Sequence, residues 1–213
     1  MKRCYFVVVT ALAFGVASPA TAQFVYLDAD EDGVCSTGDY LDATSTHLDV
    51  YIDTNRTAEG FVTECVTDEA IPIDLSSYSF ILQKVEYGYG PITFGAWADS
   101  LGYSVGITDS GARMENDTEL WIGLTGGPVL PAGKHKLGRL SVTIAGPVRV
   151  MILPSSSLSP RAATSFGTSC PGLDSDHTMQ LGVDFLDVCG VGASPDGTSV
   201  TNTTWGRIKA AYR

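Results

Sequence analysis

The sequence predicts an all-β fold, an antiparallel β-sandwich with little helix. One observation is alternation with period two: Leu48, Val50 and Ile52 alternate with polar neighbours, as do Leu140 and Val142 further along. The other is punctuation, because 23 glycines and 10 prolines separate many short apolar runs. Short strands joined by frequent turns are typical of two packed antiparallel sheets.

The expected strands, in chain order, are these runs: 24–27, 47–53, 61–66, 79–86, 92–98, 103–107, 119–124, 137–144 and 148–153. Residues 154–169, rich in serine with proline and alanine, are expected to be an irregular surface excursion. Leu181–Val188 is expected to add one more strand after it. Residues 23–189 then form one sandwich domain, which is long enough for a sizeable core.

The first 22 residues read as a secretion signal. Lys2 and Arg3 precede a short apolar run over 4–16, and Ala20-Thr21-Ala22 offers the small residues that signal peptidase cleaves. The run is shorter than the roughly 20 residues that span a bilayer. We therefore expect a secreted or cell-surface protein of bacterial origin, with no transmembrane segment in the mature chain.

Charge narrows the possible partners. The chain carries a net charge of −11, and loss of Lys2 and Arg3 with the leader leaves 11 basic residues against 24 acidic ones, a net charge of −13. Such a surface repels nucleic acid and anionic lipid, so nucleic-acid binding is excluded as a function.

Four cysteines follow the leader: Cys35, Cys65, Cys170 and Cys189. An even number in an exported chain predicts two disulfides, for which three pairings exist. We expect Cys35–Cys65 and Cys170–Cys189, because each closes a local loop without crossing the other. Zinc binding is the competing interpretation, although the spacings lack a Cys-x-x-Cys pair.

An acidic segment just after the leader fits a twelve-residue calcium loop. Asp28, Asp30, Asp32 and Asp39 occupy positions 1, 3, 5 and 12, and Gly33 stands at position 6, where the chain must turn sharply. The Val34 carbonyl at position 7 and Ser36 at position 9, through water, complete the expected ligands. Ca²⁺ prefers six to eight oxygens, so the sequence predicts one bound Ca²⁺. The alternative is an acidic turn without metal.

This loop resembles those of dockerins and of thrombospondin type 3 repeats, including Asp instead of Glu at its last position. It departs from dockerins because no second copy follows, and because Asp39 leads into the strand-like run His47–Asp53 instead of a helix. The resemblance therefore extends only to the metal ligands.

Residues 45–150 resemble a different module. The runs 48–53, 78–83, 90–94 and 131–144 are similar to the strand succession of cohesin-like sandwiches, with a late Gly-x-Leu-x-Val-x-Ile strand at 138–144. A jelly-roll-like sandwich is the neighbouring possibility. The resemblance implies a module that binds a partner protein and is not an enzyme.

Aromatic residues support an alternative function. Trp97, Trp121, Tyr87 and Tyr89 could form a platform for stacking sugars, although aromatic residues on alternating strands are often core. A secreted hydrolase is the third possibility. The chain has three histidines but no Gly-x-Ser-x-Gly elbow, and sequence alone cannot bring a pair of carboxylates together.

The C-terminal residues 190–213 differ from the rest. Gly, Ser, Thr and Asn dominate 190–204 as in a tether, and a short basic tail with Trp205, Ile208 and Tyr212 follows. A docked helix and a sorting tag both fit this pattern. Taken together, the sequence predicts a calcium-stabilised, disulfide-linked, non-catalytic module that recognises a protein or, in the alternative, a polysaccharide at the cell surface.

Overall fold

A computed structural model describes residues 24–34, 39, 41, 43–56, 64–65, 71–85, 90–107, 111–146, 148–159, 162–169 and 177–178. All strand pairs in this part are antiparallel and none of its residues is helical, which confirms the predicted all-β sandwich. The expected leader 1–22, the strand 181–188 and the tail 190–213 lie outside the described residues. The described part contains no helix long and apolar enough to cross a bilayer.

The first sheet contains four strands in the order β1-β2-β10-β6. Their bounds are β1 Phe24–Asp28, β2 His47–Asp53, β10 Lys134–Ile144 and β6 Ile92–Asp99. The long strand β10 pairs with β2 on one side and β6 on the other, and its register shifts between Lys136 and Gly138 and again between Leu140 and Val142. These bulges bend the strand around the core.

The second sheet is built around β5 Ser77–Val85 and β9 Glu119–Thr125, which pair along most of their length. Shorter strands extend it. They are β7 Val105–Gly106, β8 Arg113–Glu115, β11 Arg149–Leu153, β12 Ser165–Gly167 and β13 His177–Thr178. A separate pair joins β3 Glu64–Cys65 to β4 Ile71–Pro72.

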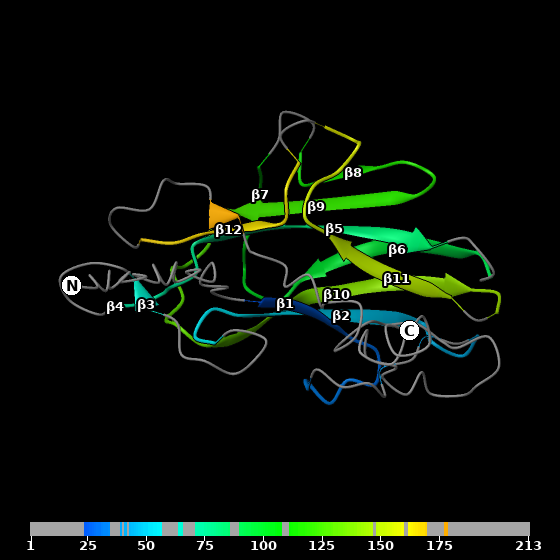
Figure 1. Cartoon of the computed structure of the whole chain (residues 1–213), viewed down its shortest axis with the longest axis horizontal. Helices are drawn as coiled ribbons and strands as arrows, with labels where there is room; N and C mark the ends of the chain where they lie inside the picture. The colour runs from blue at the N-terminus through cyan, green and yellow to red at the C-terminus, as the bar shows by residue number, and fades with distance from the viewer. Residues whose placement is uncertain are drawn as a thin grey trace, which may run out of the picture.

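The core lies between the two sheets. Figure 1 shows β5 and β9 above β10 and β2, and one cluster of buried side chains comes from both sheets. Alternate residues supply it. They include Leu48, Val50 and Ile52 of β2, Phe80 and Leu82 of β5, Leu120 and Ile122 of β9, and Leu140 and Val142 of β10. The period-two pattern in the sequence therefore marks the inward face correctly.

A surface segment covers the outer face of the second sheet. Ile81 of β5 and Trp121 of β9 point away from the core and pack with Ala162 and Leu158 from the segment 154–164. The Glu119 carboxylate holds this segment through the backbone N–H and hydroxyl of Ser157. The expected excursion is therefore real, although it continues into the unpredicted strand β12.

Most of the other differences from the sequence prediction are short strands. Strands β4, β8, β12 and β13 have two or three residues, too few to show a period. The run predicted at 103–107 forms a strand only at Val105–Gly106. The reason is Asp99, whose Oδ2 accepts the N–H groups of Leu101, Gly102 and Tyr103 and so curls the chain before β7.

Gly138 gives a test of this packing. A Cβ at this bulge would lie 2.4 Å from the Ala98 carbonyl oxygen and 2.5 Å from Cζ2 of Trp97. We expect Gly138→Ala to lower the free energy of unfolding by about 1–3 kcal/mol, as overpacking does. Urea denaturation would measure it. The exposed Ser141→Ala in the same strand should stay within about 0.5 kcal/mol, and equal effects of the two substitutions would contradict the assigned register.

Candidate metal-binding loop

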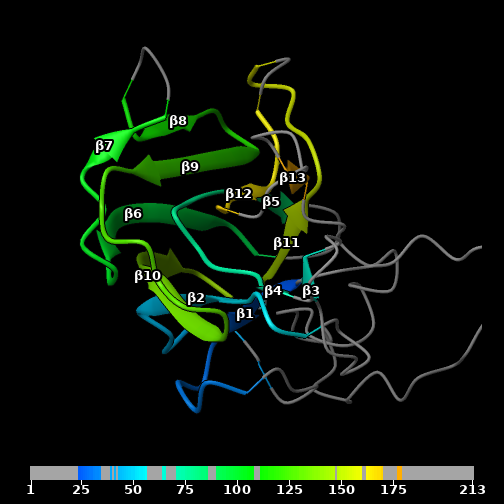
Figure 2. The same ribbon diagram turned by 90° about the vertical axis from the view of Figure 1, so that its left-hand side faces the viewer.

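The acidic loop, residues 28–39, leaves β1 and folds back over the outer face of the first sheet. Figure 2 shows the described blue segment after β1 below β2, on the side away from the second sheet. Gly33 turns the chain with φ of 72°, a conformation that glycine adopts without strain. Its carbonyl then accepts hydrogen bonds from the Tyr26 hydroxyl at 2.7 Å and from Lys134 Nζ at 2.6 Å.

Three carboxylates converge inside this loop. Oxygen atoms of Asp28, Asp30 and Asp32 all lie within 4.8 Å of one another. Asp28 is fully buried at the base of the cluster, whereas Asp30 and Asp32 are exposed. Asp39, at the far end of the loop, is also buried, and its Oδ1 accepts the N–H of Ala29 at 3.3 Å.

Backbone groups of the loop surround the Asp28 carboxylate. Its Oδ1 accepts the N–H of Glu31 and its Oδ2 accepts the N–H of Gly33, each at 2.7 Å. Burial raises the pKa of Asp28 above its ordinary value, and these two N–H groups offset only part of that effect. The ionised form is thus costly in the loop as it stands.

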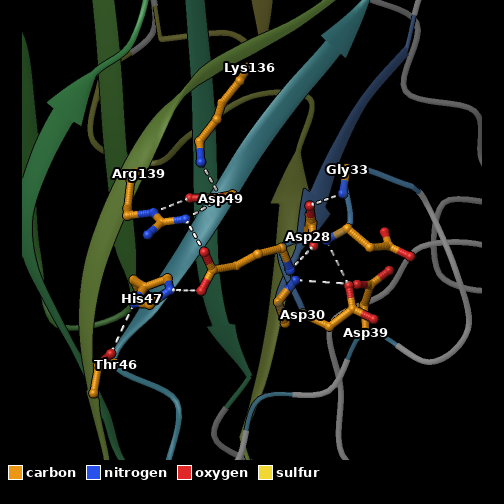
Figure 3. A network of polar contacts seen from close by, with 12 residues as sticks. Asp28, Asp30, Gly33, Asp39, Thr46, His47, Asp49, Lys136 and Arg139 are labelled. Carbon is orange, nitrogen blue, oxygen red and sulfur yellow. Dashed lines mark hydrogen bonds and ion pairs between the residues drawn. The ribbon is translucent and has the colours of Figure 1, made fainter.

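A second buried carboxylate, Asp49 of β2, lies on the same face but has cationic partners. Figure 3 shows Lys136 and Arg139 of β10 both directed at it. Arg139 Nε donates to Oδ1 at 2.7 Å and Nη2 to Oδ2 at 2.8 Å. Burial alone would raise the pKa of Asp49, but the hydrogen bonds from Arg139 and Lys136 outweigh it and hold that pKa below its ordinary value.

Glu31 connects the acidic loop to this charged group. One carboxylate oxygen meets Nε2 of His47, and the other accepts from Arg139 Nη2 at 2.6 Å. These two partners lower the pKa of Glu31, with the hydrogen bond to His47 the larger cause. Aromatic contacts add to the same surface, because Tyr26 and Tyr51 stack with ring centroids 5.3 Å apart.

The donor set fits a hard divalent cation. Ca²⁺ is bound by carboxylate and carbonyl oxygens, and the three clustered carboxylates with nearby Asp39 belong to one short loop. Asp28 provides the observation that goes beyond composition: it is fully buried and, within the described residues, forms no ion pair with a cationic side chain. A bound cation would supply the missing positive charge.

The other predicted site residues have varied placements. Val34 is described and its side chain is exposed, whereas Ser36 lies outside the described residues, as do Cys35, Cys170 and Cys189. Cys65 lies in β3. The two predicted disulfides therefore stay predictions.

The aromatic candidates are only partly described. Trp121 is 5% exposed and donates its Nε1 hydrogen to Ser79 Oγ at 2.7 Å. Trp97 is partly buried, packs edge-on against Phe80 and donates to the Tyr78 hydroxyl at 3.1 Å. Tyr87 and Tyr89 lie outside the described residues. The contacts of both described indoles are thus with the protein's own core.

Sequence reasoning missed the group formed by Glu31, His47, Asp49, Lys136 and Arg139. The available signal was the alternation itself, because it places the polar residues of β2 on the outer face. The pairing of Asp49 with Arg139 depends on the register of β10 against β2, and the bulge after Lys136 sets that register. Nothing in the sequence specifies this bulge.

Comparisons of the chain with known protein families, with curated proteins and with solved structures find no match.

The Asp49 ion pairs predict a specific pH dependence. Because its folded pKa is depressed, Asp49 contributes stability that is present above its unfolded pKa of about 3.9 and is lost as the pH falls through the folded value. Asp49→Asn should therefore cost about 3–5 kcal/mol at pH 7, since it leaves Arg139 and Lys136 without their buried partner. The cost should shrink below about pH 4.

Urea denaturation of wild type and variant at pH 7 and at lower pH measures this difference. Asp53→Asn in the same strand is the matched control, because its side chain accepts only the N–H of Asn55 among the contacts printed for it and an amide oxygen can do the same. A cost for Asp49→Asn that is equal at both pH values would contradict the ion-pair account.

Proposed function

We propose that this chain is a secreted or cell-surface, non-catalytic module that is stabilised by calcium and recognises a protein partner. The observation that carries the calcium part is the contrast between two buried carboxylates on one sheet face. Asp49 has Lys136 and Arg139 as counterions, whereas Asp28 has only backbone N–H groups and two neighbouring carboxylates. A divalent cation balances this second group.

Calcium bound here would act as a structural ion that cross-links the loop by electrostatic attraction to its oxygens. Asp28, Asp30, Asp32 and Asp39 are the described side chains that would hold it, with the Val34 carbonyl and Ser36 as the further expected ligands. Removing the ion leaves like charges close together, with Asp28 desolvated, so the folded state should lose stability. The leader-like first residues suit this proposal, because they indicate export to the cell exterior.

Recognition is assigned to the tip of the same loop. Asp30, Glu31 and Asp32 are exposed there, and the Val34 side chain is 52% exposed beside them. An apolar side chain within an acidic rim suits a protein surface with a small apolar pocket bordered by Lys or Arg. Because Trp97 and Trp121 use their faces and Nε1 atoms inside the protein, we rank protein recognition above sugar stacking.

Calcium binding is tested by removing two ligands that do not support the fold otherwise. Asp30→Asn with Asp32→Asn keeps the acceptor oxygens that bond the N–H groups of Asp32 and Val34, but removes two charges. Wild type should gain about 2.7 kcal/mol of stability at a calcium concentration of 100 times Kd. The double variant should gain far less. Thermal melting in chelator and then in calcium measures both.

Asp117→Asn is the matched control for charge, because this exposed carboxylate lies between β8 and β9 of the second sheet. It should keep the full calcium response. A wild-type midpoint that is the same in chelator and in millimolar calcium would refute the calcium site.

Recognition by the loop tip is tested with Val34→Ser, which keeps the backbone carbonyl and N–H of that residue. Cross-linking of the immobilised chain to proteins and to polysaccharides from the surface of its source cells should yield a protein partner in calcium and lose it in chelator. Val34→Ser should weaken capture about tenfold while leaving the calcium response intact, as loss of a central apolar contact does. Val129→Ser, which changes a valine that is 59% exposed on another loop, is the control. Capture of polysaccharide alone would overturn the proposed partner class.

A further inference from the structure

Glu31 has a conformation that its residue type does not favour. Its φ is 66°, and it is the one residue other than glycine with a positive φ in the part of the chain that the structure describes. Glycine or asparagine adopts this left-handed conformation more readily than glutamate. A glutamate at this position therefore points to a use for its side chain, because the backbone alone would favour another residue.

The side chain makes two ionic contacts with the sheet. Its carboxylate bridges His47, at the start of β2, and Arg139, in the middle of β10. Both partners are themselves held in place. Arg139 forms two hydrogen bonds with the buried Asp49, and Nδ1 of His47 lies 2.9 Å from Thr46 Oγ1. The sheet thus presents two fixed donors to one loop residue.

The backbone of the same residue connects to the metal cluster. The N–H of Glu31 donates to Asp28 Oδ1 at 2.7 Å, one of the two printed N–H contacts that orient this buried carboxylate. A movement of Glu31 away from His47 and Arg139 would withdraw this donor. The position of Asp28 therefore depends on a neighbour whose own carboxylate points to the sheet and away from the cluster.

We propose that Glu31 is the positioning residue of the acidic loop, which it holds against β2 and β10 so that the carboxylate cluster is formed before a cation binds. Glu31 is not a ligand in this arrangement, and it acts through Asp28. The inference rests on the proposed function for its effect on calcium affinity, but not for its effect on the order of the loop. Preorganisation of this kind strengthens binding by reducing the ordering that binding requires.

The test uses Glu31→Gln in the full chain and two measurements. In chelator, hydrogen exchange of the Gly33 amide reports how well the loop is held, because this N–H is bonded to Asp28. We expect it to exchange about tenfold faster in the variant than in wild type, while core amides of β2 and β10 keep their rates. In calcium, titration calorimetry should show a Kd about tenfold weaker, as loss of an outer-shell partner typically causes.

Glu115→Gln is the matched control, since Glu115 pairs with Arg113 on the second sheet and is remote from the acidic loop. It should change neither measurement. Glu31→Gly is the second variant: it removes the side chain and relieves the backbone. It should behave like Glu31→Gln if the carboxylate matters, and should leave exchange slow if it does not.

The outcomes separate the two proposals. Unchanged Gly33 exchange in Glu31→Gln, or a calcium Kd within twofold of wild type, overturns the positioning role. A wild-type chain that binds no calcium overturns the proposed calcium function instead, and the exchange rates in chelator then decide the role of Glu31 by themselves.

Discussion

The charge balance on the outer face of the first sheet is the constraint on which the acidic loop depends. Asp49 is fully buried there, and a carboxylate without solvent is costly unless cations surround it. Lys136 and Arg139 meet that need from β10, and Arg139 then has a second donor available for Glu31. One ion pair between neighbouring strands therefore also determines where the loop rests.

The same face shows why composition alone does not identify a metal site. Asp28 and Asp49 are neighbours in the register of β1 and β2, and both are fully buried. Their pKa values nevertheless shift in opposite directions, upward for Asp28 and downward for Asp49, because only Asp49 has cationic side chains beside it. The uncompensated member of the pair is the one in a loop with two further carboxylates.

Much of the fold could be predicted from the sequence, because alternation is imposed by burial on one face. The strands β2, β6, β9 and β11 lie where the pattern placed them, to within a residue. The acidic cluster could also be predicted, since its members are close in sequence. The contacts of Glu31 with His47 and Arg139 could not, because they join residues 16 and 108 positions apart through a register that a bulge sets.

The edges of the first sheet indicate which surface is available for a partner. At β6, Arg113 of β8 donates to the carbonyls of Phe94 and Gly95, so two acceptors on that strand are already occupied. At the opposite edge, β1 continues directly into the acidic loop, which folds over the outer face. An occupied edge disfavours addition of a partner strand. Recognition through side chains of the loop tip, where Val34 is exposed, is the mode that this arrangement favours.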